Sequence, residues 1–141
     1  MARGKNLGVV LDSSFLIAYY NTRDVHHASA ARAMLHVASG TWGRALLLEY
    51  VFLEVSTVLL ARAGLATAAD VGRTLLAAEE IDFVPCSDVF LDALEVFRGQ
   101  SRGQLSFADA AIAAVARERA GGRVVTFDRD FHDLPGITVM V

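Results

Sequence analysis

The sequence has little cysteine, proline or lysine, and it contains no long hydrophobic run. Its single cysteine, Cys86, cannot form an intramolecular disulfide, so we expect a reducing compartment. No stretch approaches the ~18–20 consecutive apolar residues that a membrane span requires. Arg3 and Lys5 precede an apolar stretch in the manner of a signal peptide, but Asp12 interrupts that stretch and no small-residue cleavage site follows. We therefore expect a cytoplasmic protein with no membrane contact.

Positive charge is also scarce. The net charge is −3, and only one of the 13 basic residues is a lysine. This excludes a general polyanion-binding surface, so any contact with nucleic acid must be local or bridged by a metal ion. Apolar residues, in contrast, make up 54% of the chain, above the usual ~45–50%. We expect one domain spanning residues 1–141 with an exposed apolar patch, and hence a partner protein or a homodimer.

Short apolar runs alternate with longer helical patterns along the chain. This alternation predicts an α/β fold with a mainly parallel sheet that is covered by helices on both faces. The chain contains no internal repeat or linker that would divide it into separate domains. The predicted strands are 9–11, 45–48, 81–84, 124–126 and 137–141, and the predicted helices are 14–20, 25–38, 49–62, 67–80, 88–97 and 106–120. The expected helix caps are Asp24, Thr67 (with Asp70), Ser87 or Asp88, and Ser106.

Asp12 follows the first predicted strand directly. A carboxylate at this position lies at the carboxyl end of the strand, which is where ligand sites form in open parallel sheets. Asp12 could equally cap the helix that begins near Ser14. The functional interpretation therefore depends on whether other carboxylates reach the same edge.

Glu54 stands out because it lies in a helix that is apolar almost all round. Such a helix is expected to be buried, and a lone buried carboxylate is unfavourable unless it is paired or bound to a cation. Glu54 could pair with an arginine or reach the solvent edge. The functional alternative is a metal ligand or a general base.

Three further acids follow expected element ends. Asp109 forms a Ser-x-x-Asp pattern with Ser106, which is typical of a helix cap, yet a first-turn acid also points out from the end of its helix. Asp128 and Asp130 follow a predicted strand and could form an ordinary polar turn. Their position at the carboxyl end of that strand favours a site.

Four of these acids could meet at one sheet edge. Four carboxylates cannot share a site as bare anions, because like charges raise each other's pKa. All-oxygen ligation suits Mg²⁺ or Mn²⁺, and such a site can bind phosphate oxygens, activate water and stabilise a leaving oxygen. The pattern therefore predicts hydrolysis of a phosphate ester. The four acids are Asp12, Glu54, Asp109 and Asp128.

Other residue types give weaker signals. His26 and His27 open a helix without the spacing of a zinc site, and we expect them to be surface or capping residues. Trp42 could stack on a nucleobase, although a loop tryptophan that covers the core is the more common arrangement.

Four segments together resemble the PIN-domain ribonucleases, and in particular the toxins of toxin–antitoxin pairs (the VapC type). The resemblance covers essentially the whole chain. It is carried, in order, by Leu11-Asp12-Ser13-Ser14, by Leu53-Glu54-Val55-Ser56-Thr57-Val58-Leu59, by Ser106-Phe107-Ala108-Asp109-Ala110, and by Val125-Thr126-Phe127-Asp128-Arg129-Asp130-Phe131.

The resemblance implies a three-layer α/β/α domain with a parallel, roughly five-stranded sheet. It also implies an endoribonuclease that depends on Mg²⁺ or Mn²⁺ and acts on single-stranded or structured RNA, with a homodimeric state and an inhibitory antitoxin. A housekeeping RNA-processing nuclease and a catalytically inert binding module remain as alternatives. The implied ligands are Asp12, Glu54 and Asp109, with Asp128 or its neighbour Asp130 as the fourth acid and with Ser14 and Thr126 as orienting groups. RNA contacts would come from arginines such as Arg23, Arg98, Arg102 or Arg129.

Overall fold

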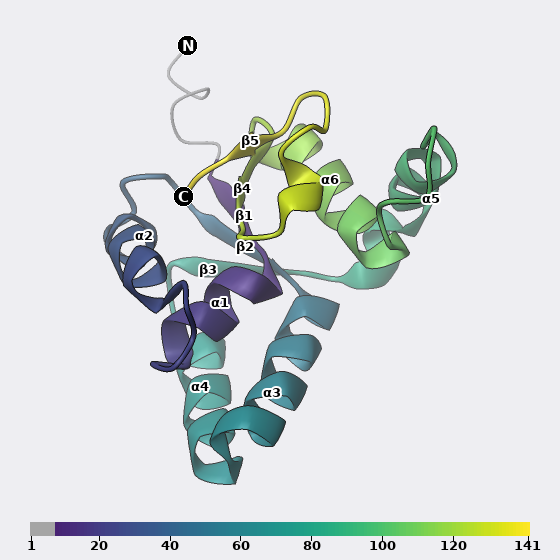
Figure 1. Ribbon diagram of the computed structural model, residues 1–141. Helices are drawn as coiled ribbons and strands as arrows, with labels where there is room; N and C mark the ends of the chain where they lie inside the picture. The colour runs from purple at the N-terminus through teal and green to yellow at the C-terminus, as the bar shows by residue number, and fades with distance from the viewer. Residues whose placement is uncertain (1–7) are drawn as a thin grey trace.

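A five-stranded, all-parallel sheet forms the centre of the computed structural model, which describes residues 8–141 (Figure 1). The strand order is β3-β2-β1-β4-β5, and each neighbouring pair runs parallel. The predicted sheet is therefore confirmed, while Arg3 and Lys5 lie outside the described residues. The strands are β1 (Val9–Leu11), β2 (Ala45–Leu48), β3 (Ile81–Val84), β4 (Arg123–Val125) and β5 (Thr138–Val139).

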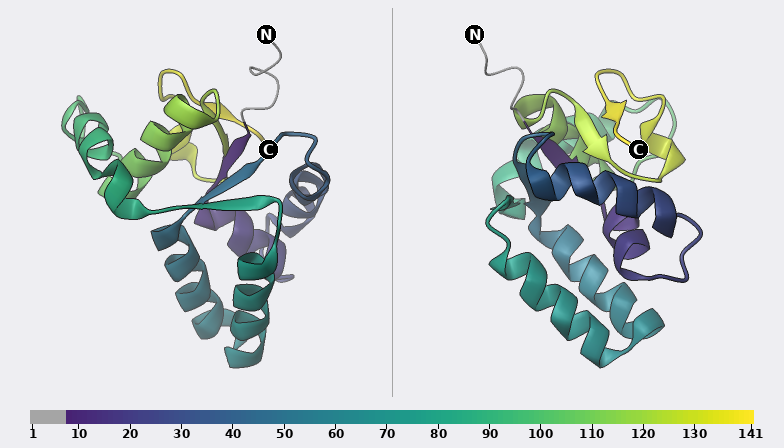
Figure 2. Two further views of the ribbon diagram at one scale, coloured as in Figure 1. Left: turned by 180° about the vertical axis from the view of Figure 1, so that it is seen from behind. Right: turned by 90° about the vertical axis from the view of Figure 1, so that its left-hand side faces the viewer.

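Helices cover both faces of this sheet. Four of them lie in the outward connections β1-β2 and β2-β3, and two lie in the connection that returns from β3 to β4. Right-handed crossovers place the helices of outward and returning connections on opposite faces, and Figures 1 and 2 show the two groups on different sides. The three-layer α/β/α fold is thus confirmed. The first group is α1 (Ser13–Tyr20), α2 (His27–Ser39), α3 (Glu49–Ala63) and α4 (Leu65–Ala77), and the second is α5 (Phe90–Arg98) and α6 (Phe107–Arg119). The 3-10 turns η2 (Cys86–Val89) and η3 (Arg129–Phe131) precede α5 and follow β4.

The core is apolar except at one point. Every residue of β1 and β2 is buried, and α6 buries an alanine-rich stretch from Ala110 to Ala116 against β1 and β4. Among residues 8–141, the buried polar or charged residues are Asp12, Ser13 and Thr126. Burying a polar group is unfavourable without compensation. The buried polar residues at the carboxyl ends of β1 and β4 therefore indicate a candidate functional site.

Helix α3 is buried along one stripe only. Val51, Val55 and Leu59 are buried, whereas Leu53 and Leu60 are exposed. The prediction of a helix buried all round is therefore wrong, and the reason is length. Fifteen residues of helix extend about 22 Å, while the four-residue strand β2 extends about 13 Å. Helix α3 packs against α4 and α1 as well as the sheet, and α3 and α4 project away from the sheet together (Figures 1 and 2).

Helix starts account for most of the local errors in the sequence analysis. Ser106 caps α6 as predicted, because its Oγ accepts the amide N–H of Asp109. Asp24 is not an N-cap, since α2 begins at His27 and the Asp24 carboxylate accepts the N–H of His26 in the preceding turn. Thr67 lies inside α4, because Gly64 at φ +91° allows the helix to begin at Leu65. Ser87 and Asp88 fall in η2, and neither caps α5.

The topology places a crevice between β1 and β4. The chain leaves β1 in one direction to β2 and β3, then returns to the other side of β1 to form β4. The connections that follow β1 and β4 therefore leave toward opposite faces, which leaves an opening at the carboxyl ends of these two strands. Asp12 immediately follows β1, and Thr126 immediately follows β4.

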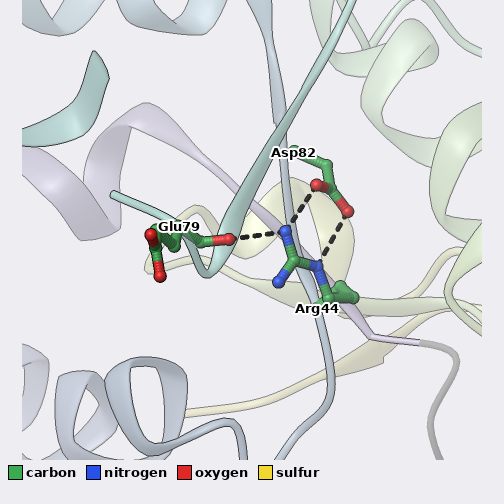
Figure 3. A network of polar contacts seen from close by, with 3 residues as sticks. All are labelled: Arg44, Glu79 and Asp82. Atoms are coloured by element: carbon green, nitrogen blue, oxygen red, sulfur yellow. Dashed lines mark hydrogen bonds and ion pairs between the residues drawn. The ribbon is translucent and has the colours of Figure 1, made fainter. Parts of the chain in front are cut away.

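The opposite end of the sheet carries a separate charged network (Figure 3). Arg44, just before β2, donates from Nε and Nη2 to the carboxylate of Asp82 in the edge strand β3, at 3.0 and 2.6 Å. The same Nη2 also donates to the carbonyl oxygen of Glu79 at 2.6 Å. The guanidinium holds the pKa of Asp82 below its usual range. This network anchors the edge strand and is remote from the crevice.

No helix among residues 8–141 is both long enough and apolar enough to cross a membrane.

Candidate active site

A cleft of about 540 Å³ opens at the carboxyl ends of β1 and β4. The four acids selected from the sequence all line it, although they come from the end of β1, the middle of α3, the start of α6 and the turn after β4. The residues that line the cleft include Asp12, Ser14, Asp24, His26, Glu54, Arg62, Ser106, Asp109, Phe127 and Asp128.

Asp12 forms the floor of this cleft, with only 5% of its surface exposed. Two hydroxyls donate to one of its carboxylate oxygens, Oδ2. Ser14 Oγ donates at 2.9 Å, and Thr126 Oγ1 donates at 2.7 Å. Burial raises the pKa of Asp12, while these hydrogen bonds act in the opposite direction by stabilising the anion. Asp12 occupies the N-cap position of α1 but makes no side-chain cap hydrogen bond, so its carboxylate is free for another role.

Both hydroxyls that donate to Asp12 also accept a backbone amide, and they lie 3.2 Å from each other. Ser14 Oγ accepts the N–H of Phe127, and Thr126 Oγ1 accepts the N–H of Asp128, both at 2.9 Å. An ionised carboxylate can only accept hydrogen bonds, so each hydroxyl donates its proton to Asp12 and accepts the amide N–H through a lone pair. This arrangement favours the ionised carboxylate and orients it toward the cleft.

Asp109 lies across the cleft in the first turn of α6. Its amide N–H donates to Ser106 Oγ at 3.0 Å, so the segment both caps the helix and places the acid at the cleft. Burial and the nearby charges of Asp12 and Asp128 raise the pKa of Asp109 to about 6. A carboxyl with this pKa changes its protonation state close to neutral pH, as functional acids often do.

Asp128 and Asp130 complete a compact group with Asp109. One ligand oxygen from each of the three lies within 4.8 Å of the other two. Asp128 Oδ1 accepts the N–H of Asp130 at 2.9 Å, which fixes the turn between them. Asp130 is exposed and lines a neighbouring hollow, whereas Asp128 lines the cleft itself. Asp12 and Glu54 face this group from the same cleft but are not members of it.

Glu54 reaches the cleft as an exposed side chain on α3. The sequence analysis expected it to be buried, and the stripe geometry of α3 explains the difference. Glu54, Val58 and Arg62 are spaced four residues apart, so they share the helix face that forms one wall of the cleft. The carboxylate is therefore accessible to solvent and to a ligand.

Three further residues contribute to this site and were not predicted from the sequence. Arg62 is the only arginine or lysine among the described residues that line the cleft, and its spacing of eight residues from Glu54 could have revealed it.

Tyr50 Oη donates to the Ala108 carbonyl oxygen at 2.6 Å, which ties the start of α3 to the start of α6. Burial and the nearby carboxylates raise the pKa of Tyr50. His26 stacks on Phe127 at the cleft, a contact between residues 101 positions apart that leaves no local signal.

The carboxylates of the cleft are not paired with basic side chains of the described residues. None of the ion pairs formed within residues 8–141 involves Asp12, Glu54, Asp109 or Asp128, because those pairs are Arg44–Asp82, Arg73–Asp70 and Arg98–Glu95. An uncompensated group of carboxylates is a ligand set for a hard divalent cation. The donor chemistry therefore fits Mg²⁺ or Mn²⁺.

The PIN-domain family model matches residues 9–137. The chain belongs to the PIN-domain family. It is 26% identical over 133 residues to a VapC ribonuclease of Archaeoglobus fulgidus, a match that covers 93% of this chain and 83% of that protein. The PIN fold is also seen in the crystal structure of Mycobacterium tuberculosis VapC20, described as a sarcin-ricin loop cleaving toxin. That structure superimposes with a TM-score of 0.80 at 24% identity and covers 95% of this chain and all of the other.

Proposed function

We propose that this PIN domain is a metal-dependent endoribonuclease that hydrolyses phosphodiester bonds of single-stranded or structured RNA as the toxin of a toxin–antitoxin pair. The observation that carries the proposal is one cleft at the switch point of a PIN fold, lined by four acids that form no ion pair within residues 8–141. The ribonuclease name of the Archaeoglobus relative and the toxin name of the VapC20 structure agree with it.

Asp12, Glu54, Asp109 and Asp128 are the proposed Mg²⁺ or Mn²⁺ ligands, and the exposed Asp130 supports Asp128. When bound, the ion would supply charge stabilisation for phosphate oxygens and make water a better nucleophile. Ser14 and Thr126 hold the Asp12 carboxylate in one orientation, and their hydrogen bonds favour its ionised form against the opposing effect of burial. They are positioning residues in this scheme, because they act through Asp12.

The two walls of the cleft have different tasks in this proposal. Asp109 and Asp128 provide the compact oxygen group on one side. Glu54, exposed on the facing wall, is placed to accept the proton of the attacking water at its carboxylate. Arg62, two turns further along α3, is placed to bind an RNA phosphate and hold the strand in register. Attack in line on phosphorus with departure of the 3′-oxygen gives 5′-phosphate and 3′-hydroxyl ends.

Cleavage of RNA by the purified protein tests this proposal directly. We expect single-stranded RNA to be cut with Mg²⁺ or Mn²⁺, EDTA to abolish cutting, and mass spectrometry of the fragments to show 5′-phosphates. Asp12→Asn and Asp109→Asn should each lose at least about 100-fold in rate. Undiminished cleavage by either variant would overturn the assignment of the site.

Protein partners form the second part of the proposal. The predicted apolar surplus is exposed on α3 and α4 (Leu53, Leu60, Leu65 and Leu76) and on α5 (Phe90, Leu91, Leu94 and Phe97). We assign the α5 face to a second copy of the chain and the remaining apolar surface to an antitoxin. Expression of the protein alone should arrest growth, and co-expression of the neighbouring small reading frame should relieve the arrest.

A further inference from the structure

His26 and Phe127 form a stacked aromatic pair at the cleft. Their ring centroids are 4.5 Å apart and their planes differ by only 4°. Both residues line the cleft together with Asp12 and Asp128. We propose that this pair is a stacking platform for a nucleobase of the RNA substrate, which makes His26 a substrate-binding residue. The inference rests on the proposed ribonuclease function and adds to it the site where one base is held.

The backbone fixes both halves of the platform. Phe127 N–H donates to Ser14 Oγ at 2.9 Å, and the same hydroxyl donates to Asp12 Oδ2 at 2.9 Å. The ring therefore sits two hydrogen bonds away from the central carboxylate. On the other side, the Asp24 carboxylate accepts the N–H of His26 at 2.8 Å and the Asp24 carbonyl oxygen accepts the N–H of His27. These contacts set the turn that presents His26.

One face of the platform is open. Phe127 is half-buried, packs against the core and covers one face of the imidazole, whereas His26 is exposed. Parallel stacking on one face leaves the opposite face of the imidazole for a ligand. A flat, unsaturated ring is the ligand that such a face accepts best, and single-stranded RNA offers unstacked bases next to the phosphate being cut.

The charge of the protein gives an independent reason for such a contact. Most RNA-binding surfaces gain affinity from many lysines and arginines. This chain has a net charge of −3, and Arg62 is the one basic residue of the 8–141 range, histidine aside, that lines the cleft. Base stacking does not depend on net charge and is tolerant of base identity. It can therefore supply affinity and position where phosphate contacts are few.

The competing explanation is purely structural. The stack joins the turn before α2 to the turn after β4, so it could serve only to hold these two segments together. A substrate platform and a structural contact differ in one measurable respect. If His26 stacks on a base, a variant without the His26 ring should no longer lose affinity when that one base is removed from the RNA. If the stack is only structural, the variant should bind every RNA of the series more weakly by the same factor.

The test uses the full-length protein and a short single-stranded RNA that the wild type binds, together with a series in which each nucleotide in turn is abasic. Binding is measured by fluorescence anisotropy without divalent metal, and cleavage is measured with Mg²⁺. The variants are His26→Ala, which removes the ring, and His26→Phe, which keeps a ring. His36→Ala is the matched control, because His36 is also exposed and stacked, on Trp42, but does not line the cleft.

We expect His26→Ala to weaken RNA binding by about 5- to 100-fold, the range of one lost base stack. His26→Phe and His36→Ala should stay within about threefold of the wild type. One abasic position beside the cut should weaken the wild type by a similar factor and should have no further effect on His26→Ala. Two results would overturn the platform. One is that every abasic position lowers the RNA affinity equally in the wild type and in His26→Ala, and the other is that His26→Phe loses as much RNA affinity as His26→Ala. Failure of the wild type to cleave any RNA would instead count against the ribonuclease function, while the anisotropy series would still decide the platform.

Discussion

Thr126 Oγ1 donates a 2.7 Å hydrogen bond to Asp12 Oδ2, although the two residues are 114 positions apart. The bond joins the ends of β4 and β1, the two strands that flank the topological switch point. The same hydroxyl accepts the amide N–H of Asp128. A single threonine thus sets the relative positions of the carboxylate on the cleft floor and the acid on its rim.

Replacement of Thr126 by valine keeps the shape of the side chain and removes both hydrogen bonds. We expect a 10- to 100-fold loss of cleavage, in the range of lost ligand-orienting contacts, and a free energy of unfolding about 1–3 kcal/mol lower because the Asp128 N–H loses its acceptor. Thr126→Ser keeps the hydroxyl and should recover most of the activity. Chemical denaturation and initial cleavage rates provide the two readouts. If valine and serine were equally active, the hydroxyl would have no positioning role.

Glu54 allows the proton-transfer and ligand roles to be separated. Glu54→Gln should lower kcat by about 100-fold or more, as expected for loss of a general base, while its affinity for Mn²⁺ falls by less than about tenfold. Its Tm should match that of the wild type within about 2 °C, because the side chain is exposed. Glu118→Gln, an exposed acid outside the cleft, is the control. An equal loss of metal affinity and of rate would make Glu54 a ligand only.

Asp109 predicts a pH dependence of stability in the metal-free protein. Its pKa rises from 3.8 to about 6 on folding, so the folded state binds this proton more tightly than the unfolded state does. The resulting stabilisation is complete below about pH 4 and is lost as the pH rises through about 6. In EDTA, the drop in Tm from about pH 4 to about pH 7 should be roughly 2–4 °C smaller in Asp109→Asn than in the wild type.

Metal binding should reverse this loss. Mg²⁺ binds the ionised carboxylate, so at neutral pH it should raise the Tm of the wild type and leave Asp109→Asn nearly unchanged. Asp92→Asn, which changes an exposed acid on α5, should behave like the wild type. A wild-type Tm that rises steadily from pH 4 to pH 7 by the same amount as that of Asp109→Asn would contradict the raised pKa.

Arg62 should contribute to RNA binding through its charge. Arg62→Ala should weaken binding by several-fold and reduce the slope of log affinity against log salt by about one. Arg73→Ala is the matched control, because Arg73 pairs with Asp70 on α4 away from the cleft. Affinity titrations at four salt concentrations are sufficient. An unchanged salt slope would show that no phosphate contacts Arg62.

The α5 face should control self-association. Leu91 is 81% exposed and lies beside Phe90 and Leu94 on this short helix. Leu91→Glu should convert a dimer into a monomer in light scattering, because burying an unpaired carboxylate opposes the interface. Leu76→Glu on α4 should remain dimeric. The opposite pattern would move the interface to the projecting helices.

The sequence was sufficient for features that depend on short-range pattern. Buried strands such as 45–48 and the Ser106 cap followed from apolar runs and side-chain chemistry, and the alternation of elements gave the parallel sheet. The sequence also made Asp12 conspicuous, as a carboxylate that directly follows a buried strand, and Glu54, as one that interrupts an apolar helix. Asp109 and Asp128 were selected only as members of the ordered set of acids, because a helix cap and a polar turn explain each of them alone.

Features that depend on long-range geometry could not be read from the sequence. The exposure of Glu54 follows from the projection of α3 beyond the sheet, which no local pattern encodes. His26 gains its place only through contact with Phe127. The start of α4 was misplaced because Gly64, at a φ of +91°, takes the N-cap position and the helix begins at Leu65, before the expected Thr67 cap.

The position of β4 in the sheet determines when the cleft can assemble during synthesis of the chain. This strand is next to the centre of the sheet, yet it is translated after all of the helices. A nascent chain that has emerged only as far as α6 carries Asp12, Glu54 and Asp109 but lacks Thr126 and Asp128, so its β1 has an unpaired edge and its cleft has no far rim. The order of synthesis therefore delays assembly of the cleft until β4 and the turn that follows it have left the ribosome.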